Sequence, residues 1–258
     1  MPGPMDGRPV LVAEMTWPAV ARTIADGESL ALLPVGAIEQ HGRHLPLVTD
    51  TEIATAICEG ASRLTGVPVL PTLQVSSSHA HTTKWPGTLS LPQRLVIQVV
   101  VELSQWVRAA GFSKLLLVNA HGGNIGPLRV AVDEIRCAGG LQVGVISYFE
   151  LSREILDAVM ADGEDVHANS AETSLMLHLR PELVVEEEIR DDPDRTTGRV
   201  FSYTVAQTSI DGLTGSPSLA SAEQGEKLFQ MIVQALAGKV ELARREAPPE
   251  LVPSLSSS

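Results

Sequence analysis

The chain has 258 residues, of which 44% are hydrophobic, and its mean hydropathy is +0.12. This length and composition suffice for a large buried core and exclude disorder over most of the chain. A formal net charge of -12 and a pI near 5.0 give an acidic surface, which repels phosphate backbones and anionic lipid head groups. We therefore expect no nucleic-acid partner and no membrane partner.

The N-terminus has no charged segment followed by a long apolar run, so it lacks the pattern of a signal peptide. No apolar run approaches the roughly 20 residues that a membrane helix needs, and we expect a cytoplasmic protein. Cys58 and Cys137 fit no zinc-knuckle spacing and are expected to be buried or idle thiols. We predict a single domain at 1–246 and a flexible C-terminal tail at 247–258.

Short β-rich runs alternate with helical patterns along the chain. The predicted elements are, in chain order, a strand at 30–35, a helix at 51–64, an extended run at 67–75, a helix at 91–110, a strand at 114–119, a helix at 127–138, a strand at 141–148, and helices at 151–160, 171–179 and 220–245. Strand followed by helix, repeated, predicts an α/β fold with a mostly parallel central sheet and helices on both faces. The polar stretch 186–197 is expected to be a solvated excursion.

Polar residues with metal-binding capacity follow two of the predicted strands. Glu39 and His41 come after the strand at 30–35, and His121 comes directly after the strand at 114–119. In open α/β sheets, ligand sites lie beyond the carboxyl ends of the strands. The fold would therefore place these side chains at a functional site.

The segment from Leu33 to Asp50 reads LPVGAIEQHGRHLPLVTD and holds the first candidate ligands. If 39–41 is extended, the side chains of Glu39 and His41 point to the same side. Asp50 adds a second carboxylate, and such nitrogen and oxygen donors suit zinc, manganese or iron. The alternative is a polar surface loop in which Asp50 caps the next helix.

The segment 119–124 reads NAHGGN, with His121 at the end of a buried strand. Gly122 and Gly123 allow a tight turn, which brings the backbone close to whatever the histidine touches. A phosphate-binding glycine loop is the alternative, but no lysine and no third spaced glycine support it.

The segment 165–174 reads DVHANSAETS, in which His167 precedes a predicted helix and Glu172 lies in its first turn. An ordinary cap, formed by Asn169 or Ser170 with Glu172 at the positive helix end, is the alternative. Three carboxylates brought together by the three segments would repel one another unless cations bound between them, and two ions can share a bridging carboxylate.

These segments resemble the motifs of the creatininase family. LPVGAIEQHGRHLPLVTD is similar to the family's LPVGSxEQHGPHLPLxTD, NAHGGN to its NGHGGN, and HANSAETS to its HAGExETS. WPGTLSL at 85–91 resembles FPGTxSL, and GSPSLASAEQG at 215–225 resembles the family's late G-[DS]-P-x-x-A-[ST]-x-E-x-G stretch. The resemblance extends over residues 30–235 and rests on an ordered set of motifs.

The resemblance implies a three-layer α/β/α sandwich with a dinuclear metal site and a homo-oligomer, with a hexamer favoured. The expected cofactors are two divalent ions, zinc or manganese or both, with iron as a further option. Carried over by position, Glu39, Asp50 and His121 would hold one metal. His41 and Glu172 would hold the other, with Asp50 bridging the two.

The implied reaction is hydrolysis of the C–N bond of a small cyclic or linear amide by a metal-bridged hydroxide. His167 falls where the family places a catalytic histidine, and it would donate a proton to the leaving nitrogen. The expected substrate-binding residues are His79, Trp85, Gly122 and Gly123.

The remaining histidines leave alternatives open. His44 would support the metal ligands or lie on the surface, and His81, in the same serine-rich loop as His79, would line the pocket or be exposed. His178, between two leucines on a predicted helix, is expected to be structural.

Other members of the family act on different substrates. They include a peptidase of the mycofactocin precursor and a deformylase of a pyrimidine intermediate in flavin biosynthesis. This chain has Arg43 in place of the usual proline, and Asn169 and Ser170 in place of glycine and glutamate. Its tryptophans do not match those that cover creatinine in true creatininases, so we do not expect creatinine as the substrate. A non-catalytic binding protein is the remaining alternative, against which the intact ligands and His167 argue.

Overall fold

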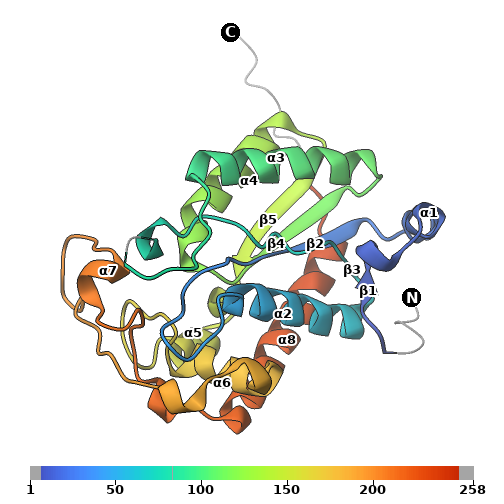
Figure 1. Cartoon of the computed structure of the whole chain (residues 1–258). Coiled ribbons are helices and arrows are strands. Elements are labelled where there is room, and N and C mark those ends of the chain that lie inside the picture. Colours follow the sequence, from blue (N-terminus) through green and yellow to red (C-terminus); the bar gives the residue numbers. More distant parts are fainter. Residues whose placement is uncertain (1–6, 83, 250–258) are drawn as a thin grey trace.

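A parallel sheet lies at the centre of the computed structural model, which describes residues 7–82 and 84–249 (Figure 1). Within that part of the chain the sheet has five strands in the order β1-β3-β2-β4-β5, and every neighbouring pair is parallel. The strands are β1 (Val10–Leu11), β2 (Leu30–Val35), β3 (Pro68–Val69), β4 (Lys114–Asn119) and β5 (Gln142–Ser147). The α/β fold with a parallel central sheet is therefore confirmed.

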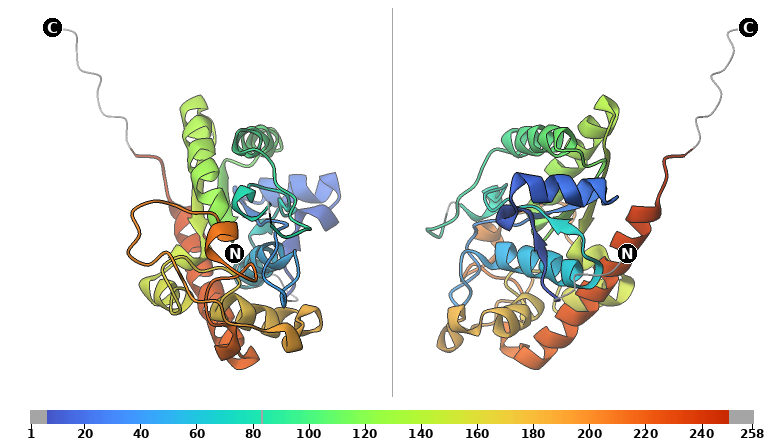
Figure 2. Two further views of the ribbon diagram at one scale, coloured as in Figure 1. Left: turned by 60° about the vertical axis from the view of Figure 1, so that its left-hand side comes forward. Right: turned by 90° about the vertical axis from the view of Figure 1, so that its right-hand side faces the viewer.

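Helices cover both faces of the sheet (Figures 1 and 2). One face carries α3 (Gln93–Ala109) and α4 (Ile125–Ala138). The other carries α2 (Thr49–Thr65), α5 (Arg153–Val159), α6 (Ser170–Leu179) and α8 (Ala222–Arg245). The result is three layers, helices on sheet on helices, as the family resemblance implies.

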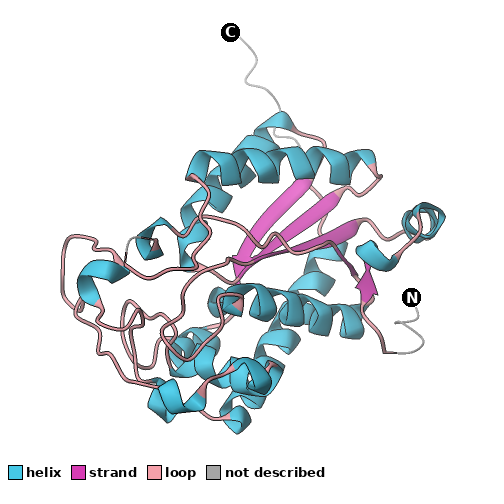
Figure 3. Cartoon of the chain, viewed as in Figure 1, coloured by secondary structure: helices cyan, strands magenta, loops and turns pink. Residues whose placement is uncertain are grey.

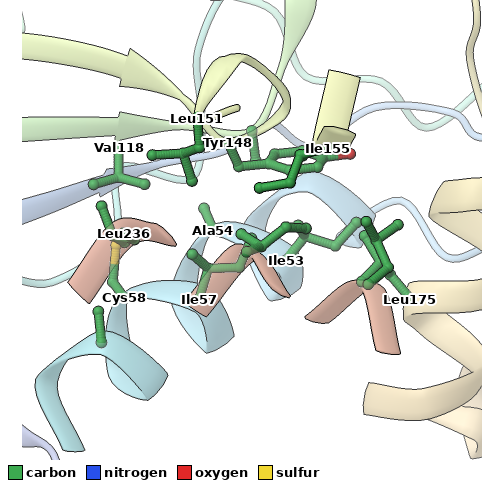
Figure 4. Close-up of a cluster of buried hydrophobic side chains, with 14 of the residues drawn as sticks. Ile53, Ala54, Ile57, Cys58, Val118, Tyr148, Leu151, Ile155, Leu175 and Leu236 are labelled. Atoms are coloured by element: carbon green, nitrogen blue, oxygen red, sulfur yellow. The ribbon is translucent and has the colours of Figure 1, made fainter. Parts of the chain in front are cut away.

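The alternation of side chains along β2 divides the core in two. Leu30 and Leu32 pack on the α2 and α8 side, whereas Ala31 and Leu33 pack on the α3 and α4 side. All six residues of β2 are buried, which explains its uninterrupted apolar sequence. Figure 4 shows the cluster on the α2 and α8 side, in which Cys58 of α2 and Leu236 of α8 lie beneath Val118 of β4, with Ile53 and Ile57 of α2 in the same cluster.

The predicted elements differ from the observed ones mainly at their ends. The strands at 30–35 and 114–119 have the predicted bounds, and the long helices shift by one or two residues. Within the predicted extended run 67–75, the strand β3 covers only Pro68–Val69. Leu73 further along makes an isolated bridge to Val35. Strand β1, helix α1 (Trp17–Ala25) and helix α7 (Val205–Thr208) were not predicted from the sequence.

Long loops gather at the carboxyl ends of the strands, on the left in Figure 3. The polar stretch 186–197 is one of them and is largely exposed, yet it is anchored through Asp192, which is buried. Asp192 Oδ2 accepts hydrogen bonds from Ser209 Oγ at 2.8 Å and from the N–H of Ile210 at 2.7 Å. The loops over this edge of the sheet are therefore tied to one another.

The remaining predictions concern the thiols, the tail and membrane helices. Cys58 is buried and Cys137 is exposed. Residues 247–249 of the predicted tail are exposed, and 250–258 lie outside the described residues. None of the helices described combines the length and the apolar character required to cross a bilayer.

Candidate metal centre

The candidate ligands converge where the loops meet the carboxyl edge of the sheet. Glu39 and His41 follow β2, His121 follows β4, and Asp50 and Glu172 lie in the first turns of α2 and α6. Glu39, His41 and Asp50 are at most 1% exposed, and His121 is 6% exposed. The sheet and two helix starts thus bring residues from distant parts of the sequence into one buried cluster.

Local packing explains why Asp50 reaches the end of β2. A Cβ added to Gly36 would lie 2.5 Å from Thr51 Cα, so only glycine lets α2 approach the strand end so closely. Thr51 Oγ1 donates to the carbonyl of Ala37 at 2.9 Å, and the N–H of Glu39 donates to the carbonyl of Leu47 at 2.8 Å. These contacts fold the loop back on itself and hold the helix start against it.

Two groups of candidate ligands share Asp50. One consists of Glu39, Asp50 and His121, the other of His41, Asp50 and Glu172, and the ligand atoms within each group lie within 4.8 Å of one another. Asp50 Oδ2 is 3.3 Å from His121 Nδ1, and Asp50 Oδ1 is 3.2 Å from His41 Nε2. One carboxylate therefore offers a different oxygen to each group, as a bridging ligand does.

Backbone groups orient the candidate ligands. His41 Nδ1 donates to the carbonyl of Glu39 at 3.0 Å, which leaves Nε2 facing Asp50. His121 Nε2 donates to the carbonyl of Ser77 at 2.9 Å, which leaves Nδ1 facing Asp50. A ligand histidine in a metal site characteristically donates its other ring N–H to a carbonyl or carboxylate in this way.

Unpaired buried atoms show that the cluster fits cations. Glu39 Oε1 and Oε2, His41 Nε2 and Asp50 Oδ2 are buried and have no hydrogen-bond partner among the residues described. Burying such atoms without partners is costly, and native proteins rarely do so. Carboxylate oxygens and imidazole nitrogens are ligands for zinc and manganese, so two divalent ions would satisfy these atoms.

The protonation of the cluster points to the same need for positive charge. Burial opposes the charged form of His41, but Asp50 and then Glu172 outweigh it and raise the His41 pKa to about 10. Burial likewise opposes the charged form of His121, and Glu39 and Asp50 raise its pKa to about 9. Burial raises the pKa of Glu172 to about 7. Without metal ions, protons on the two imidazoles offset the carboxylate charge.

A sequence model of the creatininase family, described as creatinine amidohydrolase, matches residues 13–240. The chain belongs to the creatininase family. The chain covers at least 84% of the length of each relative described next, so the family assignment applies to the whole chain.

Proteins similar to this chain act on different substrates. A creatinine amidohydrolase of Pseudomonas putida is 31% identical over 258 residues, 93% of this chain and 98% of that protein. A mycofactocin precursor peptide peptidase of Mycolicibacterium smegmatis is 32% identical over 226 residues, 82% of this chain and 84% of that protein. A crystal structure of creatinine amidohydrolase matches with a TM-score of 0.81 at 30% identity, covering 93% of this chain and 99% of that chain. Matching creatininase structures include a zinc–zinc form of a variant and a manganese form.

His167, placed by the creatininase motif at a catalytic position, lies against the ligand cluster. Its Nε2 donates to the carbonyl of Gln40 at 2.7 Å, and its Nδ1 is 3.4 Å from Glu39 Oε1. Burial, reinforced by the positive charge of His41, lowers the His167 pKa well below its usual value. The ring is therefore neutral, with Nδ1 available to accept a proton. Glu39, His41 and His167 also form a third group whose ligand atoms lie within 4.8 Å of one another.

The segment 165–172, named here the His167 arm, has an unusual backbone turn at its centre. Ala168 has φ of 49°, in the left-handed region that non-glycine residues seldom adopt. This turn directs the N–H of Ala168 to Glu172 Oε2 at 2.7 Å. Asn169 Oδ1 accepts from the N–H of Glu172 at 3.1 Å, so the predicted helix cap and the candidate ligand coexist.

The predicted substrate-binding residues lie in different surroundings. His79 is exposed, and its Nδ1 is 3.0 Å from Ser90 Oγ, outside the cluster. Trp85 is half-buried, and a Cβ added to Gly212 would lie 3.2 Å from its ring. Gly122 is open, whereas a Cβ on Gly123 would collide with His121 Nε2 and the Ser77 carbonyl. Gly123 thus protects the contact that orients a candidate ligand.

Two residues in the cluster were not among the predicted site residues. His81 is 8% exposed, and its Nδ1 is 3.3 Å from Glu39 Oε1 and 3.1 Å from Gln40 Nε2. Gln40 also contacts His167 through both its amide nitrogen and its carbonyl. Gln40 had a sequence signal only through its position within the first motif, whereas His81 was left open as a pocket-lining or an exposed residue of the serine-rich loop.

The two remaining histidines, His44 and His178, make structural contacts. His44 is buried, and its Nε2 is 2.8 Å from Thr173 Oγ1, which ties the first loop to α6. Burial and the charge of His41 lower the His44 pKa to about 4. His178 packs against Phe229 with ring centroids 5.5 Å apart, as a structural residue would.

Proposed function

We propose that this creatininase-family hydrolase is a two-metal amidohydrolase that cleaves the C–N bond of a small cyclic or linear amide. The observation that carries the proposal is the sharing of Asp50 between two three-residue groups that contain buried, unpaired ligand atoms. The proposed metals are zinc, manganese or both, because the donors are nitrogen and oxygen. Solved creatininases that contain each metal support that choice.

The proposed ligands divide by position. Glu39 and His121 would hold one ion, His41 and Glu172 the other, and Asp50 would bridge them. Bound divalent ions would lower the pKa of water from about 15.7 toward 7 and polarise the substrate carbonyl. The backbone contacts of the two histidines fix the ring nitrogens that face the ions.

His167 has the geometry of a proton carrier in this reaction. Its neutral ring turns Nδ1 toward Glu39, at the edge of the cluster. We propose that Nδ1 takes a proton from the attacking water and returns it to the leaving nitrogen as the C–N bond breaks. Expulsion of an unprotonated amide anion would be prohibitive, so the reaction needs such an acid.

The test is a metal-replete assay of purified protein against lactams, formamides and carboxamides, with elemental analysis of the same sample. The expected result is close to two metal ions per chain and turnover of at least one class of amide. Release of ammonia, formate or an amine identifies the class. Stoichiometric metal with no turnover of any amide would contradict the proposed reaction, and absence of metal would contradict the proposed ligands.

A peptidase is the second candidate, and the 32% identical mycofactocin precursor peptidase favours it. A surface cavity of about 370 Å³ borders the His167 arm and is lined by Asp165 together with Val200, Phe201 and Tyr203. Glu164 and Arg199 also line this cavity, so its mixed polar and aromatic surface suits a polar or charged peptide side chain. Short peptides added to the same assay panel, with detection of the fragments, distinguish this candidate from a small-amide hydrolase.

We also propose that the protein forms an oligomer. A homo-oligomer, with a hexamer favoured, follows from the family resemblance, and exposed Trp17 and Trp106 offer apolar surface that association would cover. Light scattering of the metal-loaded protein gives the mass directly. A monomer at micromolar concentration would contradict this proposal without affecting the metal centre.

A further inference from the structure

Gln40 lies between two buried histidines and has a fixed hydrogen-bond donor behind it. The backbone N–H of Gly42, which also donates to the carbonyl of Gly212 at 3.1 Å, is 3.2 Å from Gln40 Oε1. A backbone N–H can only donate, so this contact distinguishes the oxygen of the amide from the nitrogen. The amide nitrogen must then face the histidines, in a side chain that is itself buried.

The amide nitrogen determines the tautomer of His81. Gln40 Nε2 is 3.1 Å from His81 Nδ1. Because an amide nitrogen donates and does not accept, His81 Nδ1 must accept this hydrogen bond. The proton of a neutral His81 ring is then on Nε2.

The backbone carbonyl of Gln40 determines the tautomer of His167. It lies 2.7 Å from His167 Nε2, and because a carbonyl only accepts, Nε2 carries the proton. The 3.2 Å contact between Gln40 Nε2 and His167 Nε2 then joins two donors and is not a hydrogen bond. His167 Nδ1 keeps its lone pair, directed toward Glu39.

The imidazole rings of the cluster are crowded. The His167 ring centroid is 4.3 Å from that of His41 and 4.3 Å from that of His81. Positive charges on neighbouring rings would repel one another strongly in a buried cluster. A neutral ring carries a single N–H, and the partner of that N–H determines which ring nitrogen keeps its lone pair.

One corner of the cluster then consists of acceptors alone. Glu39 Oε1 is 3.3 Å from His81 Nδ1 and 3.4 Å from His167 Nδ1, with both nitrogens bearing lone pairs. Glu39 Oε1 has no hydrogen-bond partner in the described part of the chain. Such a corner attracts a cation or a proton in transit.

We propose that Gln40 is a positioning residue that fixes the tautomer of His81 through its side-chain amide and that of His167 through its backbone carbonyl, so that His167 exchanges protons through Nδ1. Given the proposed amide hydrolysis, a water O–H bond breaks as its oxygen bonds to the carbonyl carbon, and the proton moves to His167 Nδ1. The same proton passes to the leaving nitrogen as the C–N bond breaks, so His167 ends the cycle neutral.

Gln40→Glu is the sharpest test. One carboxylate oxygen can still accept from Gly42, but the other places an acceptor where His81 Nδ1 had a donor. We expect the proton of His81 to move to Nδ1, where it also bonds Glu39 Oε1, while His167 keeps its proton on Nε2. Nitrogen-15 NMR of the zinc-loaded protein distinguishes the two ring nitrogens. We expect kcat to fall about 10–100-fold with zinc content retained, the usual effect of losing a contact that supports metal ligands.

Gln40→Met provides a second variant that adds no buried charge, in case the carboxylate prevents folding. It removes the donor, so His81 is expected to populate both tautomers while His167 is unchanged. Gln98→Glu, on the exposed surface of α3, makes the same chemical change away from the cluster. Its histidine spectrum and its kcat should equal those of the wild type.

The assignment of Gln40 is overturned if His81 keeps its proton on Nε2 in both variants, or if His167 of the wild type is protonated on Nδ1. The tautomers are measured in the spectrum and do not depend on any assay. A wild type that hydrolyses no amide would therefore count against the proposed function and not against the role of Gln40.

Discussion

The two halves of the candidate metal centre are held in place in different ways. Glu39 and His121 lie in the loops that follow central strands of the sheet, and Asp50 lies in the first turn of a helix that packs tightly on Gly36. Glu172 instead depends on the His167 arm, whose left-handed turn and helix cap are stabilised by hydrogen bonds within the arm and to Asp162. One half is rigid because it is part of the core, whereas the other is positioned by polar contacts.

This difference has a consequence for the two ions. The group of Glu39, Asp50 and His121 lies wholly on the scaffold of the sheet and α2, whereas the group of His41, Asp50 and Glu172 needs the arm. A preformed set of ligands loses less entropy on binding than a set that must be ordered. We therefore expect one tight and one weaker metal, with the weaker one sensitive to changes in the arm.

Asp50→Ala should have the largest effect, because it removes the one carboxylate that both groups share. We expect both ions to be lost and several kcal/mol of transition-state stabilisation with them, a decrease of about 10³-fold or more in turnover. Elemental analysis and a turnover assay measure the two effects. Normal metal content in a folded Asp50→Ala protein would show that the ligand assignment is wrong.

His167→Ala should separate chemistry from metal binding. Its side chain carries the proton in the proposed reaction but belongs to neither of the two groups that share Asp50. We expect kcat to fall by about 10²–10⁴-fold, the usual contribution of a general acid–base residue, with both metals retained. Loss of one ion along with activity would instead assign His167 to the third group, with Glu39 and His41.

Metal uptake should release protons at pH 7. The surrounding carboxylates outweigh burial and raise the pKa of His41 to about 10 and that of His121 to about 9, so both rings are charged in the metal-free protein. A histidine must be neutral to bind a metal, so each ring loses one proton, and affinity rises with pH until the pH exceeds these values. Calorimetry in buffers of different ionisation enthalpy measures the protons released. A binding enthalpy that is the same in every buffer would contradict this picture.

The elements that were predicted with the correct bounds are strands whose sequences are apolar because the strands are buried. The runs LALLPV and KLLLVN are apolar because both faces of β2 and β4 are covered, so their bounds followed from composition alone. In contrast, β1 and β3 have two residues each and exist only through pairing with each other and with β2. Helix α1 (WPAVARTIA) has a clear amphipathic pattern although none of its residues is fully buried, so the sequence did carry a helix signal that was overlooked.

The candidate ligands were predictable because they lie in ordered motifs, whereas the residues around them depend on local backbone geometry. His79 and His81 would share one side of an extended segment. The structure places them in a 3-10 turn, where each residue advances by about 120°, so one ring is exposed and the other is buried. Gln40 would likewise point away from its neighbours Glu39 and His41 if extended, and its contacts with two histidines arise only after the loops fold together.

Asp162→Ala should have the smallest and most selective effect. Asp162 Oδ1 accepts from Asn169 Nδ2 at 2.9 Å, and Oδ2 accepts from the N–H groups of Ser170 at 3.0 Å and Ser216 at 2.8 Å. Its loss leaves these donors unpaired, which costs about 1–3 kcal/mol in the free energy of unfolding. Because Asn169 caps the helix that carries Glu172, we expect the weaker metal to bind about 10-fold less tightly, as when a supporting contact is lost.

The tight metal should be unaffected by Asp162→Ala, since its ligands do not lie on the arm. Asp133→Ala is the matched control, because Asp133 is an exposed residue of α4 whose ion pair with Arg136 contributes little. Titration of the metal-free variants with zinc separates the two affinities. Equal weakening of both metals would mean that the arm and the scaffold act as one unit, and an unchanged second affinity would mean that hydrogen bonds to Asp162 do not position Glu172.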